Sequence, residues 1–195
     1  AEEFQGVWIN SNIPDFPVEL PPYKIIEIEG GGQKRKIGII GLLTTDPQLY
    51  QPGVWGGAME TALTPEQGAE KMLKMLIEEQ GCDVVIPMLH QTAEDDKRMA
   101  GRKLGFPVLV SGHGTDPYIE RTEGCWVVKT GCNAEHAAVI DLLWPTAGTP
   151  GQEPNVSVNL VKCSDYGESR ELAALAKHHL RVVDDLERAF LCTIP

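Results

Sequence analysis

The sequence has few aromatic residues, no long hydrophobic run and no excess of basic charge. Aromatic side chains make up 6% of the 195 residues. The longest apolar run, around residues 84–89, is far shorter than the ~18 residues that a membrane-spanning helix needs. The 17 Lys and Arg residues are outnumbered by 28 Asp and Glu residues, which gives a net charge of -11. We therefore expect no membrane span and no nucleic-acid partner, because such a field repels a phosphate backbone.

Cysteine is also sparse, and its spacing excludes two kinds of site. The five cysteines are scattered without any Cys-x-x-Cys pair, so neither a disulfide framework nor a zinc ribbon is expected. No basic region followed by an apolar stretch opens the sequence, and no signal peptide is therefore predicted. Free thiols without a leader lead us to expect a cytoplasmic protein.

A regular alternation of strand and helix patterns is present instead. Apolar runs at 36–43, 83–89 and 107–111 are typical of strands that are buried on both faces. A helix start at 64–67 combines a capping box with a proline in the first turn, and a second helix pattern covers 93–104. Strand, helix, strand units imply parallel pairing, so the fold class expected is α/β.

Further strand patterns flank this region on both sides. Upstream, we expect a short strand at 7–9 and a hairpin that joins 23–29 to 36–43 through the glycines at 30–32. Downstream, short apolar runs follow one another without helices, at 118–121, 125–130, 137–143 and 156–161. Since no helix is available for a crossover, these four are predicted to be antiparallel.

The chain is predicted to close with an amphipathic helix over 172–191. We accordingly divide it into a main domain of residues 1–163 and a C-terminal helical segment of residues 164–195.

Histidine is the most informative residue type, because the chain has only five. His90 and His113 each follow the carboxyl end of an expected parallel strand, the edge where open α/β sheets place their sites. Neighbouring strands would bring the two imidazoles together, and neutral imidazole is the commonest protein metal ligand. Position alone leaves open that both rings merely bind loop carbonyls. His136, His178 and His179 have no partner at ligand spacing.

Two other features have structural interpretations beside functional ones. Asp95 and Asp96 are predicted to lie in the first turn of a helix, where carboxylates are favoured by the helix dipole. Trp55 lies in a glycine-rich loop, and either stacking on a nucleobase or a subunit contact is expected of it.

Several segments match one family in their order and spacing. They are VWINSNI, KIGIIGLLTTDP, DVVIPMLH, VLVSGH and TEGCWVVKTGCNAEHAAVIDL, which together run from Val7 to about Leu143. The chain resembles the calcineurin-like metallophosphoesterase superfamily and, within it, the 5'-nucleotidase group. The resemblance implies part of an α/β/β/α sandwich, with βαβ units followed by antiparallel strands and a C-terminal helix.

The resemblance also implies a function. Two divalent ions of the Zn, Mn, Fe or Mg class would act on a phosphate monoester or nucleotide, and His90 and His113 would bind the same ion. The family's remaining ligands come from Asp-x-His, Gly-Asp and Gly-Asn-His motifs upstream, none of which occurs in this sequence. We therefore expect the C-terminal portion of a phosphoesterase domain, which is inactive alone, binds at best one ion weakly without the upstream motifs, and has the N-terminal half as its partner.

One position departs from the family pattern. Thr115 stands where the family has His or Gln two residues after His113, and a hydroxyl is a poor ligand for the second ion. Asp116 could substitute through a shifted loop. An alternative function is therefore kept, that of a catalytically silent relative serving as a structural or interaction subunit in a homo- or hetero-oligomer. The sequence assigns no catalytic residue.

Overall fold

The computed structural model describes residues 5–51, 53–145 and 152–189. The strands are β1 (Tyr23–Gly30), β2 (Gln33–Leu43), β3 (Val84–His90), β4 (Val108–Gly112), β5 (Pro117–Thr122), β6 (Cys125–Thr130), β7 (His136–Leu143) and β8 (Asn155–Lys162). The helices are α1 (Pro65–Glu78), α2 (Ala93–Gly101) and α3 (Arg170–Glu187), with 3-10 helices η1 (Val54–Glu60) and η2 (Cys163–Asp165). The chain divides into two compact units, one ending at Val161 and the other beginning at Lys162.

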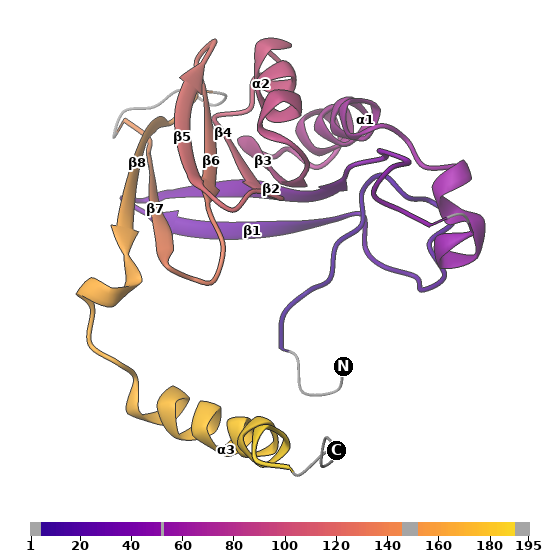
Figure 1. The fold of residues 1–195 in the computed structure, drawn as a ribbon. Coiled ribbons are helices and arrows are strands. Elements are labelled where there is room, and N and C mark those ends of the chain that lie inside the picture. Colours follow the sequence, from indigo (N-terminus) through magenta and orange to yellow (C-terminus); the bar gives the residue numbers. More distant parts are fainter. Residues whose placement is uncertain (1–4, 52, 146–151, 190–195) are drawn as a thin grey trace. The chain divides into compact units, whose positions relative to one another are not determined.

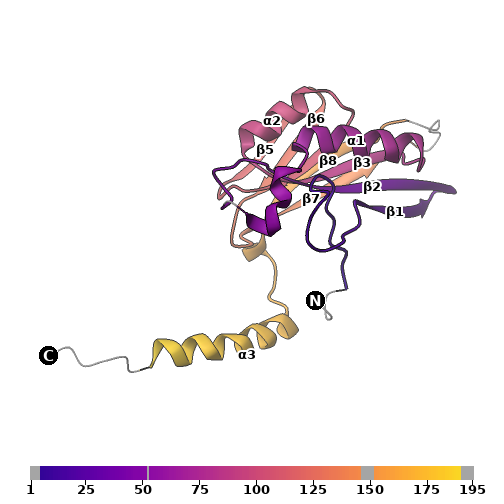
Figure 2. The same ribbon diagram turned by 90° about the vertical axis from the view of Figure 1, so that its right-hand side faces the viewer.

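The first unit is built on a six-stranded sheet with the order β1-β2-β3-β4-β6-β5. Strands β2, β3, β4 and β6 are parallel, and the two edge strands are antiparallel to their neighbours. Figures 1 and 2 show α1 and α2 together on one face of this sheet. The α/β class and the βαβ units expected from the sequence are confirmed.

The hairpin at the N-terminal edge is also confirmed. Strands β1 and β2 pair antiparallel and close at Gly30 and Gln33. Gly31 and Gly32 connect them with φ angles of 59° and 75°. A two-residue turn of this hand requires positive φ at both positions, which glycine adopts without steric cost.

The core lies between the sheet and the two helices. Alternate residues of the parallel strands, including Ile40, Val85 and Leu109, pack against apolar residues of the helices such as Leu76 and Met99. All five are at most 1% exposed. Helix α1 begins with the expected capping box, in which Thr64 and Gln67 each bind the other's backbone N–H. Apolar spacing along α1 and this fixed start determine which helix face meets the sheet.

The other face of the sheet is covered at the amino ends of its strands and open at their carboxyl ends. Val84 and Met88 point to this face from the same strand, yet Val84 is 4% exposed and Met88 is 51% exposed. Strands β7 and β8 form a separate two-stranded sheet, and β7 packs against β6. Trp144, just after β7, has its ring 5.7 Å from the guanidinium carbon of Arg35 on β2. The second layer therefore covers only part of this face.

One pairing prediction holds only in part. Strand β6 pairs antiparallel with β5, as expected, but on its other side it runs parallel to β4 and so lies between β4 and β5. The chain leaves β4, forms β5 at the sheet edge, and returns through a hairpin at Glu123 and Gly124, both of which have positive φ. The connection between the parallel strands β4 and β6 is therefore made by an edge strand, where a crossover helix is usual. The local sequence pattern does not reveal this.

The short strand expected at 7–9 is not formed. Ser11 and Asn12 bind the end of β2 that extends beyond β1. Ser11 N donates to the backbone oxygen of Gly41 at 2.8 Å. Ser11 accepts a hydrogen bond from Gly41 N at 2.9 Å. The Asn12 amide binds both backbone groups of Leu43, accepting from N at 2.9 Å and donating to O at 2.8 Å. Side-chain groups make most of the hydrogen bonds to this end of β2, and no ladder extends to residue 7.

The second unit consists of η2 and α3. Ser169 caps α3 by accepting a hydrogen bond from Leu172 N. The helix begins at Arg170 rather than at 172, and residue 191, where the helix had been expected to end, lies outside the described residues. The unit boundary falls at 161/162, whereas the sequence suggested 163/164, and the phosphoesterase assignment of the first segment stays a prediction. No described helix combines the length and apolar character needed to cross a bilayer.

Candidate functional site

The site is formed where two neighbouring parallel strands end. His90 is the last residue of β3, and His113 comes directly after β4. The register of the two strands pairs His90 with Gly112, so the two histidines emerge at the same level of the same sheet edge. Each strand is held in place by core residues on its helix-facing side, which leaves its carboxyl end free to present a polar side chain.

The two imidazole rings are in direct contact. Nε2 of His90 lies 3.2 Å from Nδ1 of His113. The ring centroids are 5.0 Å apart, with an angle of 73° between the ring planes. Both residues are exposed to solvent. The sequence-based expectation that the rings meet within reach of one ion is therefore met in geometry, while their role as ligands stays a prediction.

The electrostatic environment favours a neutral His90. Partial burial lowers the pKa of His90 below its ordinary value, and the nearby charges of His113 and Lys129 lower the pKa further. A neutral imidazole keeps one lone pair free, which is the form that binds a metal ion. The ring of His90 is therefore in a suitable state for coordination near neutral pH.

The loop after β4 has an unusual backbone. His113 has a φ of 65°, in the left-handed region that residues with a Cβ adopt at a steric cost. Such a conformation persists only where the surrounding structure holds it. Turn residues of this chain such as Lys103 and Glu123 also have positive φ, so the conformation alone does not mark the site.

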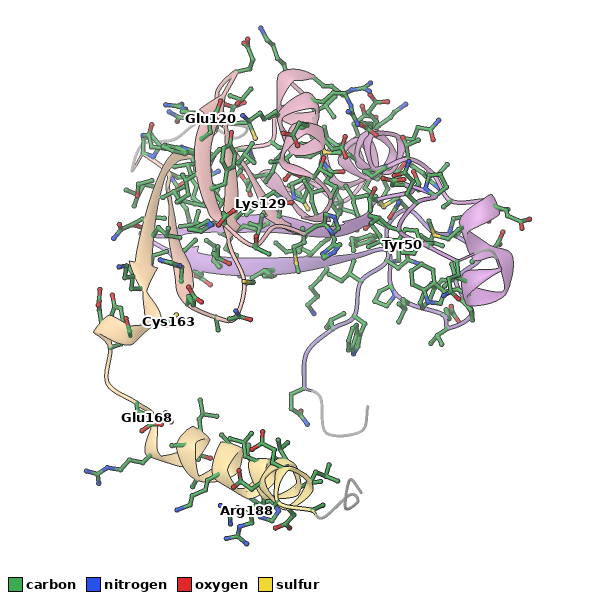
Figure 3. The ribbon with its side chains drawn as sticks, in the orientation of Figure 1. Tyr50, Glu120, Lys129, Cys163, Glu168 and Arg188 are labelled. Carbon is green, nitrogen blue, oxygen red and sulfur yellow. The ribbon has the colours of Figure 1, made fainter. Side chains whose placement is uncertain are left out.

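A buried ion pair that the sequence analysis missed lies beneath this edge. Lys129 on β6 is 3% exposed, and Asp96 in the first turn of α2 is 0% exposed. Nζ of Lys129 lies 2.8 Å from Oδ2 of Asp96. Burial raises the pKa of Asp96, and the polar groups of Lys129, Ser111 and Gln91 beside it oppose that rise. Figure 3 shows Lys129 within the first unit, beneath the helices.

A local signal for this lysine was present in the sequence. Lys129 follows Cys125 and Val127 at a spacing of two, so it faces the core with them. A lysine on the buried face of a strand needs a charged partner. Asp96 had been expected in the first turn of a helix and does lie there, but its main contact is this lysine rather than the helix dipole.

The remaining sequence candidates do not join the site. Thr115 and Asp116 are exposed. Among the described residues, no three His, Cys, Asp or Glu side chains come close enough together to hold an ion. Trp55 packs against Phe16 and Tyr50, with ring centroids 5.3 and 5.4 Å away.

The other three histidines belong to other elements. His136 begins β7, and His178 and His179 are exposed on α3 in the second unit.

Solved structures share the fold of this chain. No protein-family model matches the chain, and no curated protein matches it by sequence. The sulfate thiohydrolase SoxB of Thermus thermophilus superposes with a TM-score of 0.71 and 19% identity, over 93% of this chain and 33% of that one. A putative 5'-nucleotidase from Staphylococcus aureus gives a TM-score of 0.64 and 14% identity, over 91% and 37%. The chain therefore shares its fold with a segment of each of these two proteins.

A third structure supports the same assignment of fold. The NAD nucleotidase NadN of Haemophilus influenzae has a TM-score of 0.57 and 19% identity, over 80% of this chain and 30% of that one. The chain thus spans about a third of the length of each structure. The 5'-nucleotidase-like fold expected from the sequence is confirmed.

An apolar groove adjoins the histidine pair in this 5'-nucleotidase-like fold. It has a volume of about 330 Å³ and reaches from the N-terminal segment, at Trp8 and Phe16, across Leu43 and Met88 to His90. The groove lies on the open face of the sheet, at the carboxyl ends of the strands. The candidate metal ligands are therefore bordered by apolar surface on one side and by the buried ion pair on the other.

Proposed function

We propose that this chain is the C-terminal portion of a calcineurin-like metallophosphoesterase that hydrolyses a phosphate monoester, with a nucleotide as the favoured substrate class. The single observation that supports it is the distance of 3.2 Å between Nε2 of His90 and Nδ1 of His113. The fold of the chain agrees with this function, because the neighbouring structures are nucleotidases and a thiohydrolase.

The ring geometry fits one shared ion. Two bonds of ~2.0–2.1 Å to nitrogen atoms 3.2 Å apart subtend an angle of about 100°, near the tetrahedral value common for zinc. The lowered pKa of His90 favours the neutral form that the bond requires. His90 and His113 would hold one divalent ion of the Zn, Mn, Fe or Mg class.

An ion in this position would polarise a phosphoryl oxygen and lower the pKa of the attacking water. The residues of this chain would bind this ion and orient the groups around it. Thr44 N donates to the backbone oxygen of His90 at 3.2 Å, which fixes the end of β3 beside the end of β2. The apolar groove beside His90 excludes water from one side of the site and offers a surface for the leaving group.

The site needs further ligands from outside the described residues. Two neutral imidazoles supply no negative charge, whereas tight zinc sites use three or four protein ligands. We propose that the N-terminal half of the same phosphoesterase supplies them and packs on the open sheet face around Met88. The chains of the neighbouring structures are about three times as long as the segment matched here, which leaves room for such a half. The chain alone is then inactive.

Metal titration tests the proposal. Isothermal titration with Zn²⁺ should show weak binding of one ion, which His90→Ala and His113→Ala each abolish. His178→Ala is the matched control, because His178 and His179 form a second exposed ring pair with centroids 5.3 Å apart. Wild-type protein without a Zn²⁺ signal, or a signal that survives both site variants, would contradict the proposed metal site.

Hydrolysis and upstream sequence complete the test. We expect no metal-dependent hydrolysis of p-nitrophenyl phosphate by the chain alone above the His113→Ala background. The transcript upstream of Ala1 should encode Asp-x-His, Gly-Asp and Gly-Asn-His motifs. If it encodes none of them, the enzymatic function fails.

A second function is favoured by one observation. Thr115 offers only a hydroxyl where a second ion would need a stronger ligand, and no third ligand joins the two histidines within the described residues. A catalytically silent relative that serves as a structural or interaction subunit agrees with this. Zn²⁺ binding that is absent while the protein forms a defined complex would favour it over the phosphoesterase.

A further inference from the structure

One buried ammonium group connects the two loops that carry the histidines. Nζ of Lys129 donates to the backbone oxygen of Gln91 at 2.7 Å, and Gln91 follows His90 directly. The same Nζ donates to the backbone oxygen of Gly112, which directly precedes His113. It also donates to Oγ of Ser111 at 2.9 Å and forms the ion pair with Asp96 at 2.8 Å.

We propose that the Lys129–Asp96 pair is a positioning device that holds His90 and His113 in the geometry needed to share one ion. Lys129 is a positioning residue and not a catalytic one. Its three N–H groups are shared among four protein oxygens, and its side chain is 3% exposed. No N–H group is left to bind a substrate.

The strain at His113 explains why such a device is needed. The φ of 65° at His113 is unfavourable for a residue with a Cβ, so the loop would relax if its neighbours released it. The bond from Lys129 to Gly112 O fixes the peptide group on the N-terminal side of His113. The bond to Gln91 O fixes the chain immediately after His90. One side chain therefore fixes both rings relative to each other.

Asp96 is what allows the lysine to be there. An ammonium group removed from water is costly unless an opposite charge lies beside it. Asp96 reaches Lys129 from the first turn of α2, the helix that follows β3 after Gln91 and Thr92. Strand β3 thus supplies the ring of His90, and helix α2, which follows it, supplies the negative charge of Asp96.

The proposal makes a prediction that distinguishes positioning from general stability. Lys129→Met alone leaves a buried carboxylate without its partner and should lower the melting temperature sharply. The double variant Lys129→Met/Asp96→Leu replaces the ion pair by apolar side chains of similar size and should melt cooperatively near the wild-type temperature. The double variant lacks both bonds to the backbone next to the histidines, so its two rings should no longer be held in fixed positions.

The experiment measures melting, Co²⁺ affinity and histidine ring ¹⁵N shifts for wild type, the double variant and Lys97→Met. Lys97→Met is the matched control, because Lys97 pairs with Glu120 at 3.2 Å on the exposed side of α2. We expect the double variant to bind Co²⁺ about 10–100-fold more weakly, the usual loss for a residue that orients metal ligands. Its rings should also lose the fixed tautomers that the 3.2 Å His90–His113 contact imposes. The control should resemble wild type.

The consequence for metal affinity rests on the proposed function, whereas the ring shifts do not. If wild type binds no Co²⁺, the proposed metal site fails and the ring tautomers alone decide the positioning role. A double variant that melts normally and keeps the wild-type ring shifts would overturn the inference. A double variant that fails to fold would also overturn it, because the ion pair would then be required by the whole unit.

Discussion

A Cβ placed at Gly112 would lie 3.1 Å from Nδ1 of His90. The two residues are partners in the β3–β4 register, and the imidazole of His90 lies over the backbone of Gly112. A side chain at residue 112 would require the ring to shift by a few tenths of an ångström. The identity of residue 112 therefore influences the position of the first candidate ligand.

Gly112→Ala should displace the ring of His90 and weaken metal binding. The new methyl group would be tighter against the ring than ordinary contacts allow, and the exposed ring can move to relieve it. We expect about tenfold weaker Co²⁺ binding and a stability loss of no more than about 1 kcal/mol. Gly114→Ala is the control, because a Cβ there meets Lys129 at an ordinary 3.6 Å. Equal affinities for the two variants would contradict the expectation.

Gly68→Ala should destabilise the protein although alanine favours helices. Gly68 lies inside α1, and a Cβ there would lie 2.8 Å from Cβ of Asn12 and 2.9 Å from Cδ2 of Leu42. Helix propensity offers about 1 kcal/mol, whereas overpacking costs about 1–3 kcal/mol. Chemical denaturation should therefore show a lower free energy of unfolding. Gly101→Ala is the control and should be neutral or stabilising, because a Cβ there meets nothing within 4 Å. A stabilised Gly68→Ala variant would contradict the prediction and show that Asn12 can move aside.

Cys125 should be unreactive in the folded protein even at alkaline pH. Burial raises the pKa of its thiol from 9.0 to about 12. Because the folded pKa is above the unfolded one, the stability linked to this thiol is complete below pH 9 and is lost as the pH approaches 12. Mass spectrometry after iodoacetamide treatment at pH 9 should find exposed Cys163 modified and Cys125 intact. Rapid labelling of Cys125 in the native protein would contradict its burial.

The isolated chain should self-associate through the open sheet face. Met88 is 51% exposed on a strand whose other residues are largely buried, and an uncovered apolar face favours association. Met88→Glu should shift the sedimentation profile toward monomer. Val18→Glu, at a residue 60% exposed but outside the strands, should leave the profile unchanged. A monodisperse, cooperatively melting wild-type monomer would show that the face needs no cover.

Local sequence patterns predicted most of the elements and the meeting of the two histidines. Apolar runs with strand length, separated by helix patterns, require parallel strands, and parallel strands place their carboxyl ends at one edge. His90 and His113 each follow such an end, so their proximity followed from local pattern alone. The capping box at Thr64 and the glycine turn at 30–32 are equally local, since each depends on residues a few positions apart.

The surroundings of the histidines depend on contacts between distant segments and could not be read from local patterns. Lys129 and Asp96 are 33 positions apart, and each looks ordinary in its own segment, as a strand lysine and a first-turn aspartate. They meet because β6 inserts between β4 and β5, an arrangement set by long-range pairing rather than by periodicity. The same holds for Asn12, whose side chain replaces a strand at the edge of β2. Periodic patterns report burial along one element, whereas the partner of a buried charge depends on which elements pack side by side.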